Sequence, residues 1–230
     1  MRYLAASPET MLAPGAPSAK IADALTHGSD WASNVVDATM KVRYGAGTSY
    51  HPAAAFDVLD LAPEKIDSVR RSITAFNDSV VALSKARGSG ELMHDIRSDL
   101  RSVPGMARFD HTADMIYHSD RPAEAVYATI GADSRLPSNV RSAALQAKAA
   151  VGALVLAHDE YGWFAPMNAS YADAAGPTAH MPISADQYDP WSESGVSETH
   201  NGFFGAVHAR EFARAIGAYD GADDRIALVA

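Results

Sequence analysis

The chain has 230 residues, and its 28 acidic side chains outnumber its 19 Lys and Arg side chains, so its formal net charge at pH 7 is −9. It contains no cysteine, which excludes a disulfide framework, a Cys-ligated metal site and a thiol nucleophile among these residues. The basic residues occur singly or in pairs such as Arg70-Arg71, so we expect no nucleic-acid partner. Apolar residues make up 47% of the chain and predict a soluble globular protein. We expect no membrane association, because no apolar stretch reaches the about 20 residues of a membrane helix and the first residues do not resemble a secretory signal.

The first sixty or so residues predict two strands with a pair of helices between them. The apolar run Tyr3–Ala6 predicts a buried strand. Ser18 is expected to cap the first helix, and Ser29 or Asp30 the second. Residues 53–61 are the best candidate for the next strand.

The strongest periodicity belongs to a helix that is predicted to begin at Pro63. Its apolar residues recur in steps of three and four and form one stripe: Ile66, Val69, Ile73, Phe76, Val80 and Leu83. A glycine-rich loop follows it. Beyond this loop, Glu91–Val103 predicts a second amphipathic helix.

The second half of the chain is less regular. Thr112–His118 predicts a short helix, and Ser138 is expected to cap a long, Ala-rich helix over 139–158. Further on, residues 179–182 predict a strand, 203–218 a helix and 225–230 a last strand. Because strands alternate with amphipathic helices, we predict an α/β protein with a partial sheet flanked by helices.

Several motifs of the first half follow one another in the order of a known family. The first strand runs into Ala6-Ser7-Pro8-Glu9, a loop with Gly15 and Pro17 follows, and the second strand contains Asp57-Val58-Leu59-Asp60-Leu61. This ordered set resembles the clostripain family of cysteine endopeptidases, in the half that lies downstream of the catalytic cysteine. The resemblance extends over residues 1–83 and continues more weakly through 114–118.

The resemblance implies a partial caspase-like α/β sheet with a helical C-terminal extension. Residues 1–87 would form the C-terminal part of the caspase-like domain, and residues 88–230 a mostly helical extension packed on it. The implied reaction is hydrolysis of peptide bonds by a Cys/His dyad, in which a thiolate attacks the scissile carbonyl. Both dyad residues lie upstream of the matched region in the family, so no catalytic residue is expected here. The chain would shape the substrate cleft and pair with the missing N-terminal catalytic portion.

The resemblance places the substrate-binding residues at Ala6, Ser7 and Glu9. Pro8 replaces an acidic residue of the family, and Pro14 stands where the acid of the basic-residue pocket is expected. Since an Arg or Lys side chain needs a carboxylate partner, Glu9 remains the acidic candidate. The expected partner is a peptide or protein substrate. The sequence requires no cofactor, and the family resemblance is compatible with calcium.

Two other functions remain open. The chain could be a degenerate peptidase homologue that binds a peptide or a partner without cleaving it. It could also be a metal-dependent hydrolase, because Asp114 and His118 at i,i+4 spacing would project from one helix face, with Asp110 nearby. We expect this group to be a solvated helix end and therefore predict no metal site.

Other acidic and histidine residues are weaker candidates. Glu9, Asp57 and Asp60 could form an acidic patch for a basic side chain or a calcium ion. His94-Asp95 and His158-Asp159 could each belong to a triad with a serine. The sequence has no Gly-x-Ser-x-Gly elbow, and adjacent side chains on a helix point apart. We therefore expect both pairs to be polar residues near helix surfaces.

Overall fold

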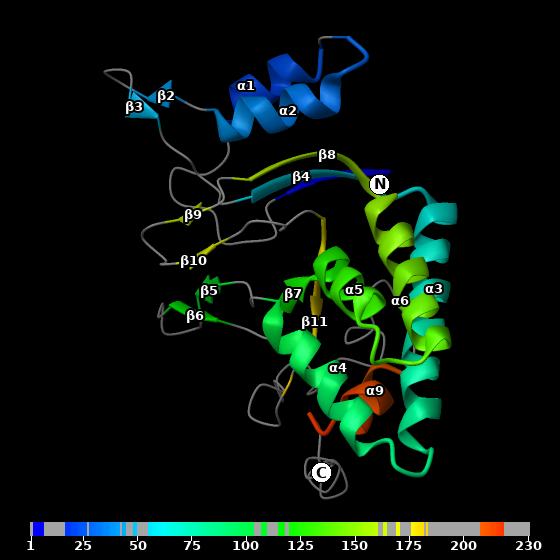
Figure 1. Ribbon diagram of the computed structural model, residues 1–230. Coiled ribbons are helices and arrows are strands. Elements are labelled where there is room, and N and C mark those ends of the chain that lie inside the picture. The colour runs from blue at the N-terminus through cyan, green and yellow to red at the C-terminus, as the bar shows by residue number, and fades with distance from the viewer. Residues whose placement is uncertain are drawn as a thin grey trace, which may run out of the picture.

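The computed structural model is a mixed α/β structure with small antiparallel sheets (Figure 1). It describes residues 2–6, 17–26, 28–41, 43–44, 48–49, 55–103, 107–109, 115–117, 120–160, 163–164, 169–170, 176–181, 183 and 208–218. The largest sheet lies between a pair of helices and a larger helical body. The α/β class predicted from the sequence is confirmed at this coarse level.

Strand β4 is the centre of the three-stranded sheet. The sheet combines β1 (Tyr3–Ala6), β4 (Ala55–Asp60) and β8 (Val155–Glu160) in the order β1-β4-β8, and both pairings are antiparallel. All six residues of β4 are buried. Its alternating side chains enter two different hydrophobic clusters, one on each face of the sheet.

Strand β1 lies at the edge of this sheet. Tyr3 and Leu4 are 41% and 38% exposed. The predicted strand is confirmed, but the prediction that it is buried is wrong. The physical reason is its edge position: among the described residues β1 pairs with β4 alone.

Helices α1 (Ser18–Ala24) and α2 (Trp31–Met40) cover one face of the sheet (Figure 1). Their cluster joins Ala24, Val35, Val36 and Met40 to Phe56 and Val58 of β4. Both predicted helices are confirmed. The cap predicted for α1 is wrong, because Pro17 occupies the N-cap position and Ser18 is the first helical residue. Asp30 occupies the N-cap position of α2 as predicted, but its side chain makes no cap hydrogen bond. The Ser29 hydroxyl contacts the Asp30 carboxylate instead, at 3.2 Å.

The helical body lies on the other face. It contains α3 (Pro63–Ser84), α4 (Gly90–Ser102), α5 (Ala123–Ala132), α6 (Ser138–Gly152) and α9 (Ala209–Ala215). Helix α3 begins at Pro63 as predicted, where the missing proline N–H is not needed for a helical hydrogen bond. Helix α5 was not predicted, because its sequence is apolar nearly all round and carries little helical periodicity.

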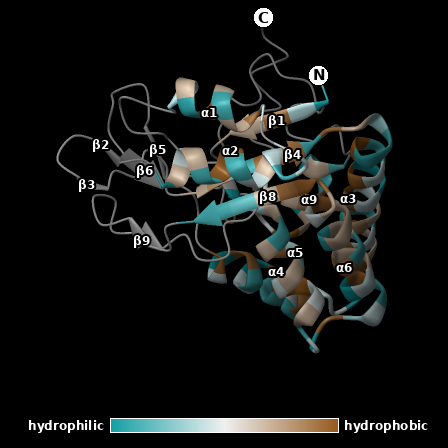
Figure 2. Cartoon of the chain, turned by 90° about the horizontal axis from the view of Figure 1, so that it is seen from above, coloured by the Kyte–Doolittle hydropathy of each residue, from teal (hydrophilic) through white to brown (hydrophobic). Residues whose placement is uncertain are grey.

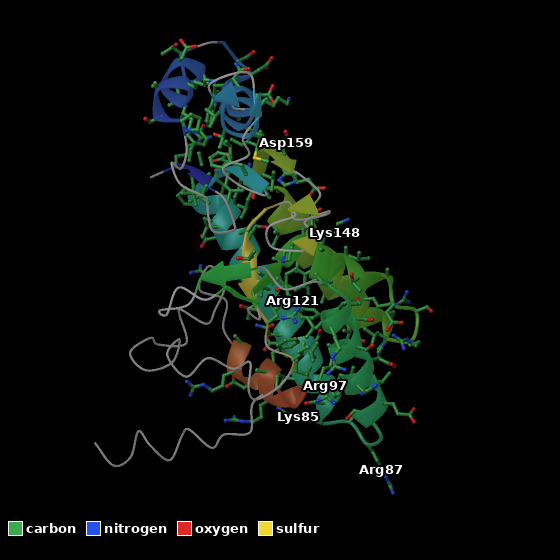
Figure 3. The ribbon with its side chains drawn as sticks, turned by 90° about the vertical axis from the view of Figure 1, so that its left-hand side faces the viewer. Lys85, Arg87, Arg97, Arg121, Lys148 and Asp159 are labelled. Carbon is green, nitrogen blue, oxygen red and sulfur yellow. The ribbon has the colours of Figure 1, made fainter. Side chains whose placement is uncertain are left out.

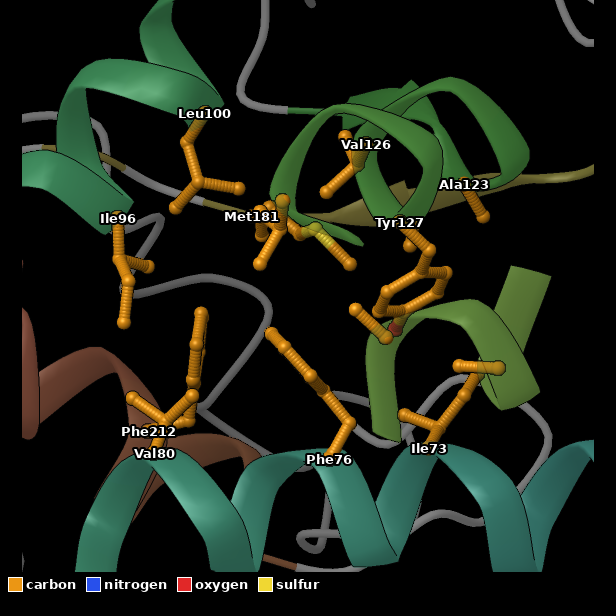
Figure 4. Close-up of a cluster of buried hydrophobic side chains, with 14 of the residues drawn as sticks. Ile73, Phe76, Val80, Ile96, Leu100, Ala123, Val126, Tyr127, Met181 and Phe212 are labelled. Carbon is orange, nitrogen blue, oxygen red and sulfur yellow. The ribbon is translucent and has the colours of Figure 1, made fainter. Parts of the chain in front are cut away.

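The main core is built on the stripe of α3, as the periodicity predicts (Figure 4). The Phe76 ring lies 5.2 Å from the Tyr127 ring of α5 and 5.6 Å from the Phe212 ring of α9, measured between centroids. Small residues of α6 let the helices approach closely: Ala144, Ala147 and Ala150 are all buried. Each large side chain buried here contributes roughly 1.5–3 kcal/mol to stability.

Short antiparallel pairs complete the described structure. They are β2 (Arg43–Tyr44) with β3 (Thr48–Ser49), β5 (Ala107–Phe109) with β6 (Met115–Tyr117), β7 (Asp120–Pro122) with β11 (Thr178–His180), and β9 (Trp163–Phe164) with β10 (Ala169–Ser170). Strand β11 confirms the strand predicted at 179–182. No helix in the described part of the chain has the length and apolar character needed to cross a membrane.

Two predictions of helix are wrong. Residues 115–117 form strand β6, whose Met-Ile-Tyr sequence favours pairing with β5 over a single helical turn. The helix predicted over 139–158 ends at Gly152, and residues 155–160 form strand β8. This strand satisfies the backbone groups of β4 on the side opposite β1, a long-range pairing that helical periodicity does not show. The strand predicted at 225–230 lies outside the described residues.

Candidate functional site

One end of the three-stranded sheet brings together residues that are far apart in sequence. In the register of the strands Ala6 of β1 is opposite Asp57 of β4, and Asp57 is opposite His158 of β8. The strands therefore place these three residues in a row across the sheet. Glu160 follows two positions after His158 and points to the same face.

Asp57 and His158 form the best-defined polar contact of this row. The Nδ1 atom of His158 lies 2.9 Å from Oδ1 of Asp57, whose side chain is only 4% exposed. The backbone N–H of Gly176 donates to the same carboxylate oxygen at 3.0 Å. On the opposite side of the ring, Nε2 of His158 lies 3.4 Å from Oε2 of Glu160. We call Asp57, His158 and Glu160 the sheet-end cluster.

The surroundings of the sheet-end cluster favour a charged histidine. Burial by itself would lower the pKa of His158. The hydrogen bonds and negative charges of Asp57 and Glu160 outweigh burial and raise its pKa above the ordinary value of 6.5. The cluster can therefore hold a proton between two carboxylates, and Asp57 fixes the orientation of the ring.

The other end of β4 is held by a separate ion pair. Asp60 lies 3.3 Å from both Arg2 and Lys65, and it accepts a hydrogen bond from the N–H of Ala62 at 3.1 Å. Burial would raise the pKa of Asp60, but these donors and positive charges lower it below its ordinary value. Asp60 anchors the start of α3 and does not join Asp57 in one acidic patch.

The sequence-predicted site residues are only partly described. Ala6 lies at the end of β1, partly exposed, in the row with Asp57 and His158. Ser7 and Glu9 lie outside the described residues, as do Asp110, Asp114 and His118 of the metal alternative. Within the described ranges, no group of three His, Asp or Glu side chains is arranged to hold a metal ion.

The prediction for His158 is wrong, since it lies on a strand in the sheet-end cluster and not near a helix surface. His94 lies on α4 and is exposed, as expected. The missed signal is the apolar run Leu154–Ala157, which follows Gly152 and leads directly into His158. A short apolar run after a glycine is a strand signal, and Figure 2 shows β8 changing from hydrophobic at its start to hydrophilic at its end.

Comparison with protein-family models, curated proteins and solved structures gives no match to this chain. The resemblance to the clostripain family therefore rests on the ordered sequence motifs.

Proposed function

We propose that this chain forms the substrate-cleft portion of a clostripain-like cysteine endopeptidase with a partial caspase-like sheet. In this proposal the Cys/His dyad belongs to a polypeptide portion upstream of Tyr3. The thiolate of that portion attacks the scissile carbonyl, and its histidine transfers the proton to the leaving amine. The end of β1, with Ala6 and the following Ser7 and Glu9, binds the peptide substrate.

The observation that carries this proposal is the pairing of β1 with β4. The two motifs of the resemblance, Ala6-Ser7-Pro8-Glu9 and Asp57–Leu61, are separated in sequence by a loop and two helices. Their strands are direct neighbours, and Ala6 is opposite Asp57. The antiparallel register brings the first residue of each motif together at Ala6 and Asp57, where the proposed cleft would lie.

The exposed edge of β1 supports the need for a further portion. On its outer side β1 has no strand neighbour among the described residues, and its apolar side chains Tyr3 and Leu4 are exposed. An apolar edge strand with free backbone groups favours pairing with another strand. A catalytic portion that adds a strand here would widen the sheet beside β1, next to the proposed substrate-binding residues at the end of that strand.

The test begins with the coding sequence upstream of Met1. We expect an in-frame cysteine shortly before the first strand and a histidine before that cysteine. The longer chain should cleave fluorogenic peptides, and iodoacetamide or a Cys→Ala variant should abolish the cleavage. The 230-residue chain should be inactive alone, since it contains no cysteine. An upstream sequence without a cysteine, or a longer chain whose cleavage survives alkylation, contradicts the proposal.

The same edge favours a second function, binding without cleavage. An open edge strand can pair with an extended segment of a partner, and the backbone hydrogen bonds supply the affinity. Titration of peptides into the present chain by calorimetry distinguishes this function. Saturable binding in the absence of any upstream cysteine would favour a non-catalytic binding module, whereas no binding would count against it.

A further inference from the structure

The three-stranded sheet has two outer strands, β1 and β8, on either side of β4 (Figure 2). Among the described residues neither outer strand has a second strand neighbour. The two edges differ in how strongly they oppose the addition of another strand. This difference indicates which edge is an interaction surface.

Strand β8 has two features that oppose pairing at its edge. Two consecutive residues of β4 lie opposite Ala157 and Val155, so Leu156 is an extra residue in a bulge. The strand then ends in the ionisable residues 158–160. Bulges and charged side chains are common means by which proteins block exposed strand edges.

Strand β1 has neither feature. Its sequence Tyr-Leu-Ala-Ala contains no charged residue, and its register with β4 is regular along the whole strand. Tyr3, Leu4 and Ala5 are all exposed. Strand β1 therefore presents an apolar edge that nothing in its own sequence blocks.

One backbone hydrogen bond fixes which groups of β1 point outward. The N–H of Leu61, directly after β4, donates to the carbonyl of Arg2 at 2.6 Å, so the backbone of Arg2 faces β4. This direction alternates along an antiparallel strand. Leu4 therefore also faces β4, whereas the N–H and C=O groups of Tyr3 and Ala5 point away from the sheet.

These outward groups are complementary to those of a second copy of the chain. In an antiparallel pair with a two-fold axis at Leu4, Tyr3 of each copy lies opposite Ala5 of the other, and every outward N–H meets an outward C=O. The two Leu4 residues then face each other at the axis, with their Cα atoms about 4.5 Å apart. An axis at Tyr3 or at Ala5 would not pair these two residues with each other.

The charges at the ends of β1 favour the same arrangement. The pairing places Arg2 of one copy opposite Ala6 of the other, so no like charges face each other along the strand. The Arg2 side chain contacts Asp60 of its own copy but is 63% exposed. Ala6 lies beside Asp57, at the end of the sheet that carries the two carboxylates of the sheet-end cluster. A positive group of each copy therefore approaches the acidic sheet end of the other.

We propose that the 230-residue chain forms a two-fold dimer in which β1 pairs antiparallel with β1 of a second copy, with Leu4 at the axis, so that the two sheets join into one. This inference does not rest on the proposed function, because it requires no cysteine and no substrate. A second copy and an upstream strand would occupy the same edge. A longer chain that adds its own strand beside β1 should therefore not form this dimer.

The first experiment is disulfide crosslinking of single-cysteine variants, which is straightforward because the chain contains no cysteine. Leu4→Cys should form a crosslinked dimer under mild oxidation, since Cα atoms about 4.5 Å apart lie within the range that a disulfide spans. The matched controls are Leu25→Cys and Leu156→Cys, which replace leucines that are 56% and 41% exposed. We expect Leu4→Cys to crosslink about tenfold faster than either control, or more.

The second experiment tests the backbone pairing without a disulfide. Because the N–H of Ala5 points outward, Ala5→Pro removes a donor from the free edge and none from the pairing with β4. Its thermal unfolding should therefore stay close to that of the unmodified protein. Sedimentation velocity should show a dimer for the unmodified protein and mainly monomer for Ala5→Pro.

Four results would overturn the dimer. They are an unmodified protein that stays monomeric at every concentration, equal crosslinking of Leu4→Cys and its controls, a dimer that persists in Ala5→Pro, and unfolding of Ala5→Pro, which would contradict the outward direction of its N–H. The first result needs no variant, so a variant that fails to fold does not leave the proposal untested. An upstream sequence without a cysteine would contradict the peptidase proposal and would change none of these results.

Discussion

Two arginines show how individual polar side chains are stabilised in this fold. Arg121 is buried and donates to the backbone carbonyls of Leu100 and Val103 through Nε and of Met181 through a terminal nitrogen (Figure 3). It thereby joins the end of α4 to the segment after β11. Arg135 is instead half-exposed and lies 2.8 Å from Asp133. Arg135 lies shortly before α6, and it also forms ion pairs with Asp95 and Asp99 of α4.

Asp99 is the most perturbed of these carboxyl groups. Burial and the neighbouring carboxylate of Asp133 raise the pKa of Asp99 to about 6, from an ordinary 3.8, despite the opposing charge of Arg135. Its Oδ2 atom is buried and has no hydrogen-bond partner among the described residues. A proton on Asp99 would supply a donor to Asp133. The neutral form of this carboxyl is therefore favoured up to about pH 6, well above the range of an ordinary aspartate.

We predict that Asp99→Asn stabilises the protein at neutral pH. The raised pKa means that stability is present below pH 4 or so and is lost as the pH rises through about 6. An amide keeps the donor and removes the charge, so the gain in unfolding free energy should reach about 1 kcal/mol at pH 7.5, after allowance for the lost ionic contact with the half-exposed Arg135. Urea unfolding of the unmodified protein and of Asp99→Asn at pH 4 and 7.5 measures this gain in unfolding free energy.

The control for this prediction is Asp95→Asn, which removes another carboxylate bound to Arg135, at 2.8 Å. It should give no comparable gain, because it breaks a direct charged contact. A gain from Asp99→Asn that is equal at both pH values would contradict the titration argument.

At the scale of elements, the central position of β4 organises the molecule. Its face with Phe56 and Val58 packs on α1 and α2, and Leu59 on the opposite face enters the main core. Strand β8 closes one side of β4, although a register irregularity falls between Val58 and Leu59. The segment at Gly176 packs against this region, since it contacts both Asp57 and Val155.

We predict that Gly176→Ala is more destabilising than Gly88→Ala. Both glycines have positive φ, +79° and +81°, which an alanine adopts at a cost of about 1–2 kcal/mol. A Cβ at Gly88 meets open space. A Cβ at Gly176 would lie 3.2 Å from Cγ2 of Val155 and would press on the contact with Asp57.

Thermal unfolding measures the loss of stability in each variant. The backbone strain is common to both, so the difference between the two losses is the added packing strain at Gly176. We expect an additional loss of about 1 kcal/mol for Gly176→Ala. Equal losses would mean that the segment around Gly176 shifts freely and does not support Asp57.

At the scale of the whole molecule, the sheet separates two hydrophobic clusters and leaves an exposed edge. The larger cluster joins α3, α4, α5, α6 and α9, and the smaller one joins α1 and α2 to β4. The edge of β1 presents Leu4 at 38% exposure, whereas Leu25, directly after α1, is 56% exposed but lies on no strand. Both leucines are exposed apolar side chains, but only Leu4 lies on a strand edge. A comparison of the two therefore distinguishes the effect of the strand edge from that of an exposed apolar side chain.

We predict that the isolated chain self-associates through β1 and that Leu4→Lys reduces this association. A charged side chain on an edge strand opposes pairing with a second strand. Leu25→Lys makes the same chemical change at a more exposed position and should have a much smaller effect. Sedimentation velocity over a range of protein concentrations measures both. Equal effects of the two substitutions would assign the association to general hydrophobicity.

Local sequence patterns were enough to predict several helices and strands. The stripe from Ile66 to Leu83 defines α3, Pro63 marks its start, and the apolar run of β4 lies within the predicted range 53–61. Helices α2 and α4 also follow from periodicity. These signals suffice because a helix face or a buried strand has to keep its apolar residues at fixed spacing.

Other features of the fold depend on contacts between segments that are distant in sequence. Residues 155–160 form a strand because β4 offers them a partner, and the antiparallel register then places His158 beside Asp57, 101 residues away. The burial of β4 and the exposure of β1 likewise depend on which elements lie beside them. Strand pairing couples distant segments through backbone hydrogen bonds that carry little sequence information, so the site at the sheet end could not be located from residue spacing.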